Sequence, residues 1–262
     1  MNLKYLLLIP GIILIILFIG GCGSSDLTKI LSAEERFAMG KVNFDDEDYL
    51  DAINEFEIVK LQFPGSAVAD DAQYYLAECR FKREEYLLAA MEYQTLKSSM
   101  PSSSFVPSAQ YKIGSCYYHL APNSNLDQEY TNRAIDEFQA FVEYYPSEEL
   151  APDATAKIKE LTERLAKKIY DVANLYMVLE YYKSATIYYT IVFEKYHDTP
   201  FAEPALVGCV RSLIARNKLN DARRDIDKYF DKYPDGQLKN DVLTLQQEVG
   251  AKLSQSTSSV PK

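Results

Sequence analysis

A short pattern recurs five times along the chain, and it constrains the fold more than any other feature of the sequence. In each copy an alanine follows a mostly large apolar position by three residues and precedes another by four. Positions i, i+3 and i+7 share one face of an α-helix, so the pattern predicts a helical repeat array with one such helix per copy. The copies are Tyr49-x-x-Ala52-x-x-x-Phe56, Tyr86-x-x-Ala89-x-x-x-Tyr93, Thr131-x-x-Ala134-x-x-x-Phe138, Tyr182-x-x-Ala185-x-x-x-Tyr189 and Leu219-x-x-Ala222-x-x-x-Ile226.

Each copy is expected to be the second helix of an antiparallel pair. A proline follows every copy and ends its helix, because proline cannot continue a helix interior; these are Pro64, Pro101, Pro146, Pro200 and Pro234. Upstream lies a first helix with its own small residue, which lets the two helices pack closely. Counting back twelve positions from the alanine gives Gly40, Ala77 and Ala173, while the third unit has Gly114 and the fifth has Val210.

Two segments depart from the regular spacing. Pro152 to Glu180 has no glycine or proline after its start, and its apolar residues recur every three or four positions. It predicts one long helix of about 40 Å between the third and fourth units. Residues 121–129 form a polar insertion in the third unit, which predicts an exposed loop. The segment from Gln237 onward predicts a frayed tail.

The repeated positions are those that define the tetratricopeptide repeat, and the chain resembles that family from about Ser32 to Pro234. The resemblance implies an all-α fold, a right-handed solenoid of about five helix pairs with the long helix between units three and four. We expect units one to three in residues 32–150, the long helix with units four and five in 151–236, and a C-terminal tail in 237–262.

The N-terminus is a targeting segment rather than part of the fold. Lys4 precedes an apolar run from Leu6 to Ile19, and Gly20-Gly21-Cys22 follows. This resembles the bacterial lipoprotein box, in which small residues precede a cysteine that is acylated. It predicts a signal peptide over 1–21, a covalent lipid such as palmitate on Cys22, and a lipidated tether over 22–31. The alternative is a transmembrane anchor, for which the available apolar stretch is short.

The other cysteines are expected to be buried, reduced thiols. Cys79 and Cys116 are 37 residues apart, the same spacing as Ala52 and Ala89, so they hold the same place in consecutive first helices. Neighbouring helices lie about 8–10 Å apart, which is too far for a disulfide bond. Cys209 lies on an equivalent face of a later helix and is also expected to be a small buried hydrophobe.

Catalytic, metal and nucleic-acid sites are not expected. His119 and His197 lie outside any zinc-binding motif, and no phosphate-binding glycine loop or serine-nucleophile motif occurs. Asp45-Asp46-Glu47-Asp48 lacks the glycine and final glutamate of a calcium loop. The net charge of −10 disfavours nucleic acid. An enzyme on a helical scaffold is therefore a weak alternative.

The whole layout resembles the BamD family of outer-membrane assembly lipoproteins. The lipoprotein box, the five units and the long helix that opens the fourth unit carry the resemblance, together with the segments Phe138 to Pro146 and Pro152 to Tyr176. It implies a non-enzymatic component on the periplasmic face of the outer membrane, which binds the periplasmic domains of BamA and unfolded β-barrel proteins. The alternatives are a pilus-secretin pilot or a cell-wall coordinating factor, which typically lack the long helix.

The family register also implies a binding groove lined by first helices. Aromatic residues with a few charges on this face suit an extended, aromatic-rich peptide. The alternative is that these side chains pack between helices. The expected groove residues are Phe37, Lys41 and Phe44 from unit one, Tyr74, Glu78 and Phe81 from unit two, and Tyr111 and Tyr118 from unit three.

Overall fold

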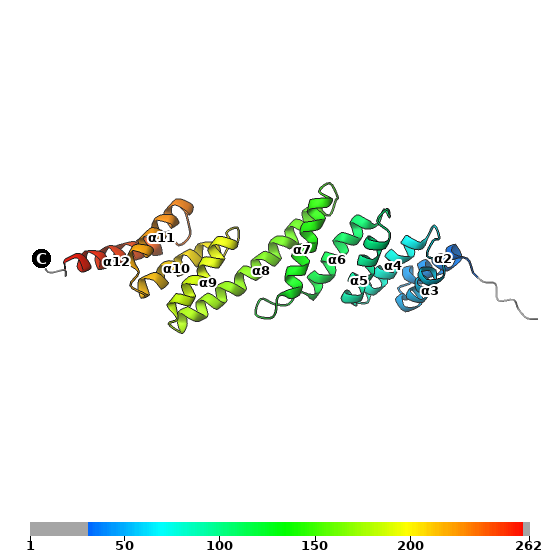
Figure 1. Cartoon of the computed structure of the whole chain (residues 1–262), viewed down its shortest axis with the longest axis horizontal. Helices are drawn as coiled ribbons and strands as arrows, with labels where there is room; N and C mark the ends of the chain where they lie inside the picture. The colour runs from blue at the N-terminus through cyan, green and yellow to red at the C-terminus, as the bar shows by residue number, and fades with distance from the viewer. Residues whose placement is uncertain (1–30, 259–262) are drawn as a thin grey trace, which may run out of the picture.

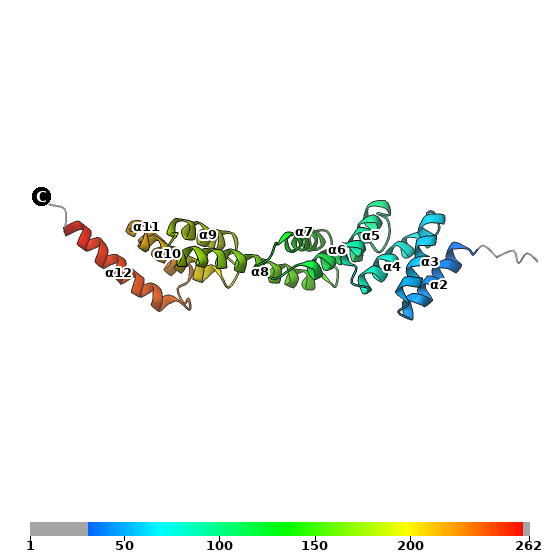
Figure 2. The same cartoon turned by 90° about the horizontal axis from the view of Figure 1, so that it is seen from below.

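The structure, a computed structural model, describes residues 31–258, which form eleven α-helices and no β-strand. Each helix packs mainly on its neighbours in sequence, which gives the elongated solenoid of Figure 1 and of the turned view in Figure 2. This confirms the all-α fold of repeated helix pairs. The pairs are α2 (Ala33–Asp45) with α3 (Tyr49–Gln62), α4 (Ala69–Lys82) with α5 (Tyr86–Ser99), α6 (Val106–Leu120) with α7 (Glu129–Tyr144), α8 (Ala151–Val178) with α9 (Tyr182–Lys195), and α10 (Ala202–Ala215) with α11 (Leu219–Lys232); α12 (Lys239–Ser258) ends the array.

Within a pair, the small residue of the first helix lies against the aromatic ring of the second. A Cβ atom added to Gly40 would lie 2.6 Å from the Phe56 ring, and one added to Gly114 would lie 2.7 Å from the Phe138 ring. The rings therefore fill the space that a side chain would need. The close packing expected from the small residues is thus present in these two units.

The long helix is confirmed as α8, which runs through 28 residues with a proline in its first turn. Its first half packs on α7 in a core cluster that contains Ala154 and Leu161. Its second half packs on α9 in a separate cluster that contains Ala173. One continuous helix therefore joins an N-terminal half and a C-terminal half that have separate cores.

The insertion in the third unit is a largely exposed loop, as expected, and it is also held against α8. Arg164 Nη1 donates to the carbonyl oxygens of Ala121 and Pro122, at 3.0 and 3.1 Å, and Lys168 Nζ donates to that of Leu126. Gln128 is only 6% exposed, and its side chain donates to two carbonyls of the same loop. The loop is therefore a latch on the long helix, because its backbone acceptors meet cationic donors there.

The expectation of a frayed C-terminal tail is wrong for residues 239–258, which form α12. Leu238, Val242, Leu245 and Val249 recur every three or four residues and give this helix an apolar face. Val242 and Val249 are buried in the core cluster shared with α10 and α11. This helix therefore covers the last helix pair, whose apolar surface would otherwise be open to water.

Cys79, Cys116 and Cys209 are free and buried, as expected from the repeat register. Burial raises the pKa of the Cys79 and Cys116 thiols to about 12, so neither forms a reactive thiolate at neutral pH. Cys22 and the signal segment 1–21 lie outside the described residues. No helix within residues 31–258 is long and apolar enough to cross a membrane.

Candidate functional site

The eight expected groove residues share one face of α2, α4 and α6, and they define what we call the inner row. The inner row follows the helical spacing i, i+4 and i+7 in α2 and α4, as in Phe37, Lys41 and Phe44, and the spacing i and i+7 in α6. Tyr111 and Glu78 are buried, at 8% and 7% exposure, and the other six side chains are half-buried. The inner row is therefore a partly covered surface rather than a row of fully exposed rings.

Between α2 and α4, the inner row packs on Tyr75, a residue that the sequence did not single out. Lys41 Nζ lies 4.1 Å from the centre of the Tyr75 ring, in a cation–π contact. Phe44 meets the same ring edge to face at 5.3 Å, and Phe37 lies at 6.0 Å from it. We call the line along which corresponding helices of successive units meet a seam. Tyr75 thus closes the first seam, between α2 and α4.

Between α4 and α6, an ion pair closes the next seam. Glu78 accepts hydrogen bonds from the Tyr93 hydroxyl at 2.5 Å and from Lys112 Nζ at 2.9 Å. The Lys112 ammonium also lies 4.7 Å from the centre of the Phe81 ring. Tyr74 stacks on Phe105 at 4.3 Å. Glu78 is therefore a buried, paired carboxylate, and Phe81 keeps a partly open ring.

Between α6 and α8, hydrogen bonds from tyrosine hydroxyls to carboxylates connect the two helices. The Tyr111 hydroxyl donates to Asp153, and the Tyr118 hydroxyl donates to Glu160 at 2.7 Å. Burial opposes ionisation of Asp153, but hydrogen bonds from Lys157 and Tyr111 outweigh it and lower the pKa of this carboxyl. The inner row thus continues onto the first half of α8. Its role in binding stays a prediction.

The same register continued into the C-terminal half leads to an open cavity of about 540 Å³. It is lined by Tyr170, Asn174 and Met177 of α8 and by Val207 and Arg211 of α10, which hold the positions of the inner row. These residues were missed, although extending the register by two units would have found them.

A glycine explains why this seam is open. Tyr75 and Lys112 close the earlier seams from the position two residues before the small residue, and on α10 that position is Gly208. A Cβ atom on Gly208 would lie 2.6 Å from the Tyr189 ring. The ring of the preceding unit therefore requires glycine here, and no side chain is left to close the seam.

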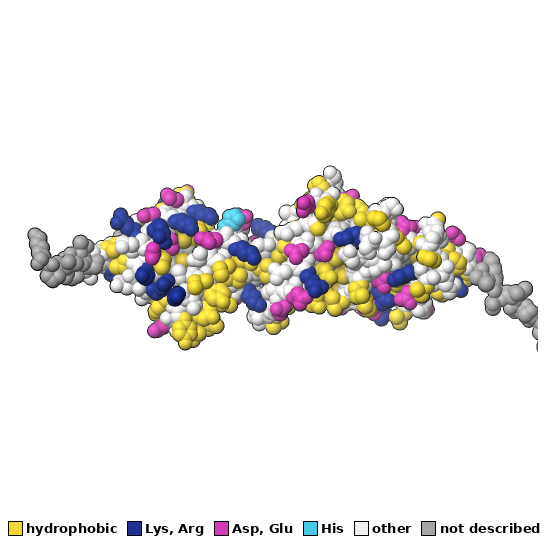
Figure 3. All heavy atoms as spheres, viewed as in Figure 1, with side chains coloured by type: hydrophobic (Ala, Val, Ile, Leu, Met, Phe, Trp, Pro, Cys, Tyr) yellow, Lys and Arg dark blue, Asp and Glu magenta, His cyan; other side chains and the backbone are white. Residues whose placement is uncertain are grey.

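An exposed apolar rim adjoins this cavity at the turn from α8 to α9. Val178 lines the cavity and is 80% exposed. Figure 3 shows hydrophobic side chains gathered at this end of α8. A contiguous apolar surface beside a cavity is typical of a protein-binding site. The exposed members of the rim are Leu175, Val178, Leu179 and Tyr181.

Comparison with known proteins gives one family match. Residues 31–216 match the family model described as YfiO, outer membrane lipoprotein. None of the curated proteins compared with the chain matches it.

Several solved structures resemble the chain at low identity. The TPR2AB domain of yeast Sti1 in its pHSP90 complex is 14% identical, with 86% of each chain covered and a TM-score of 0.46. The P58(IPK) TPR domain is 17% identical over 85% of this chain and 56% of that chain, with a TM-score of 0.42. The apo form of RapI is 13% identical over 88% and 89% of the two chains, with a TM-score of 0.42.

Proposed function

Since the chain belongs to the YfiO family of outer membrane lipoproteins, we propose that it is a BamD-like scaffold of the machinery that inserts β-barrel proteins into the outer membrane. It is anchored on the periplasmic face by a covalent lipid on Cys22. It performs no catalysis. Its work is to bind a BamA-like barrel component and unfolded β-barrel substrates at the same time.

One observation carries the proposal: a single long helix joins two halves whose first-helix faces differ. The N-terminal half presents the half-buried inner row of aromatic and charged side chains. The C-terminal half presents an open, mostly apolar cavity with an exposed apolar rim. A 28-residue helix spans about 42 Å, so it keeps the two surfaces at a set distance.

The two surfaces suit different partners. The inner row alternates partly open rings with charges, such as Phe44 beside Lys41, which suits a transient, extended peptide. The cavity is concave and mostly apolar, with the Arg211–Asp241 ion pair in its lining, and the rim is apolar. Such a surface suits lasting docking of a folded domain. We therefore assign substrate binding to the inner row and docking of the BamA-like domains to the cavity and rim.

The first prediction tests this function by depletion and complementation. Depletion of the protein should lower the levels of β-barrel proteins in the outer membrane, and the wild-type chain should restore them. The Val178→Asp variant should fold but fail to restore the β-barrel protein levels, because the substitution places a charge in an apolar docking surface. The variant should also no longer co-purify the barrel component. Met91→Asp is the matched control, since Met91 is 65% exposed on α5, away from the cavity.

The depletion result also separates the alternatives. Unchanged β-barrel levels after depletion would refute the assembly role. A defect confined to pilus secretins or to the cell wall would then favour a secretin pilot or a cell-wall coordinating factor. Normal complementation by Val178→Asp would refute only the docking assignment.

A further inference from the structure

In the N-terminal half, a polar cross-link joins the second helices α3 and α5 each to the next helix pair. Between α3 and α5, Gln73 Nε2 donates to the backbone oxygen of Glu92 at 2.9 Å and to its carboxylate at 2.8 Å. Lys60 Nζ from α3 donates to the same carboxylate at 2.6 Å. An amide and an ammonium thus satisfy one partly buried carboxylate.

The seam between α5 and α7 repeats this arrangement. Gln110 Nε2 donates to the backbone oxygen of Glu137 at 2.9 Å and to its carboxylate at 2.7 Å. Lys97 Nζ donates to the Gln110 amide oxygen and lies 4.0 Å from the Glu137 carboxylate. Lysine, glutamine and glutamate therefore form a repeated structural unit in this chain.

The seam between α9 and α11 keeps the carboxylate but lacks both donors. Asp225 lies three residues after Ala222, as Glu92 lies three after Ala89. The lysine position is Phe193 and the glutamine position is Leu206. Asp225 accepts no hydrogen bond from residues 31–258, although its side chain is only 18% exposed, and its closest ion-pair atom is Arg224 Nε at 3.8 Å.

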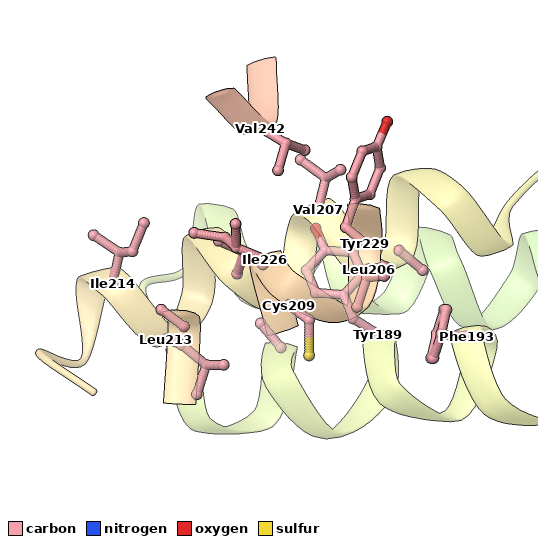
Figure 4. Packing of buried hydrophobic residues seen from close by; sticks show 14 of the residues in the cluster. Tyr189, Phe193, Leu206, Val207, Cys209, Leu213, Ile214, Ile226, Tyr229 and Val242 are labelled. Atoms are coloured by element: carbon pink, nitrogen blue, oxygen red, sulfur yellow. The ribbon is translucent and has the colours of Figure 1, made fainter. Parts of the chain in front are cut away.

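A cavity of about 470 Å³ opens at this carboxylate. Its apolar lining comes from Phe193, Leu206, Cys209 and Leu213, and Figure 4 shows these residues together on α9 and α10. The polar lining residues include Thr190 and the carboxylates of Glu194, Asp221 and Asp225.

The two cations in the lining already make contacts with other lining residues. Arg224 is 71% exposed, and it pairs with Asp221 at 3.2 Å and with Asp225 at 3.8 Å. Lys228 Nζ lies 4.3 Å from the centre of the Phe193 ring. Burial raises the pKa of Asp225, because a carboxylate removed from water is harder to ionise.

We propose that this cavity binds the side chain of a lysine from a partner protein, with its ammonium at Asp225 and its aliphatic stem on Phe193, Leu206 and Leu213. The chain itself supplies this chemistry in the α3–α5 and α5–α7 seams, where Lys60 and Lys97 reach the equivalent carboxylates. A lysine stem buries well along apolar surface. The three donors of its ammonium match the carboxylates of Asp225 and Glu194 and the Thr190 hydroxyl.

The test uses two small probes that differ in one group. N-acetyl-lysine-N-methylamide carries the ammonium, whereas N-acetyl-norleucine-N-methylamide has the same four-carbon side chain without the ammonium. Each is titrated into the whole mature chain while the methyl NMR signals of Leu206 and Leu213 are recorded. We expect saturable shifts with the lysine probe and at least tenfold weaker binding of the norleucine probe.

Two variants assign the binding to the carboxylate. Asp225→Asn should weaken the lysine probe at least tenfold, whereas Asp227→Asn, exposed on the same helix, should leave it unchanged. Absence of saturable shifts, equal binding of the two probes, or wild-type binding by Asp225→Asn would each overturn the proposal. The probe pair alone decides the question if the Asp225 variant fails to fold.

Discussion

Four turns inside the helix pairs hold a non-glycine residue in the left-handed backbone region. Glu47, Glu84, Glu180 and Asn217 have φ angles of 65°, 60°, 59° and 55°. Each lies two residues before its second helix, where the chain must reverse within a few residues. The left-handed region costs an ordinary residue about 1–2 kcal/mol, and asparagine less. The three glutamates thus place strain at corresponding turns.

The second prediction is that Glu84→Gly stabilises the protein by roughly 0.5–1 kcal/mol. Glycine relieves the strain, although its greater freedom in the unfolded chain offsets part of the gain. Urea unfolding measures the change. Glu84→Ala is the control, because it removes the charge but keeps the Cβ atom, and it should give no gain. Equal stabilisation by both variants would show that charge rather than backbone conformation is responsible.

At this scale, contacts within a helix pair were easier to predict than contacts between pairs. Counting along the repeat predicted close helix packing at Gly40, but it did not predict that the Phe56 ring is the residue packed there. Gly208 was missed, because it faces Tyr189 of the preceding unit. That contact depends on how one unit is rotated on the next, which the period of a repeat does not specify.

At the scale of elements, α8 is the part of the fold on which the arrangement of the two halves depends. Its length was predicted, because an uninterrupted apolar periodicity without glycine or proline is enough to indicate a helix. The latch formed by residues 121–128 was not predicted. Its acceptors are backbone carbonyls, and its donors Arg164 and Lys168 lie about 40 residues away. The sequence of a polar loop does not reveal such a partner.

The third prediction concerns this latch. Arg164→Ala with Lys168→Ala should broaden the distance distribution between spin labels on Gln94 of α5 and Lys195 of α9, because the middle of α8 loses its brace. Lys167→Ala is the control, since among residues 31–258 Lys167 pairs only with Asp171 of the same helix. Double electron–electron resonance spectroscopy measures the distribution of distances between the two spin labels. An unchanged width in the double variant would show that α8 alone fixes the two halves.

At the scale of the whole molecule, the two halves differ in charge as well as in surface. Residues 31–150 contain 9 Lys and Arg against 22 Asp and Glu, whereas residues 151–258 contain 16 against 15. Figure 3 shows most of the visible cations on the C-terminal half. An acidic half attracts basic segments and repels anionic surfaces. This difference in charge adds to the difference between the first-helix faces. Both support the proposal that one half binds substrate and the other docks the barrel component.

The last prediction is that substrate binding and docking can be separated. Phe44→Ala with Phe81→Ala should weaken binding of a peptide from the C-terminus of a β-barrel protein by at least about thirtyfold, since the loss of one aromatic anchor alone typically costs roughly 2 kcal/mol. The barrel component should still co-purify, because the cavity on α8 and α10 is intact.

Phe44 and Phe81 are preferable targets to the buried Tyr111, whose hydroxyl donates a hydrogen bond to Asp153. Tyr144→Ala is the matched aromatic control, since Tyr144 is 71% exposed on α7 outside the inner row. Fluorescence anisotropy of the labelled peptide measures the affinity, and thermal unfolding checks that each variant is folded. Wild-type affinity in the folded double variant would mean that the inner row is packing between helices and that the substrate binds elsewhere.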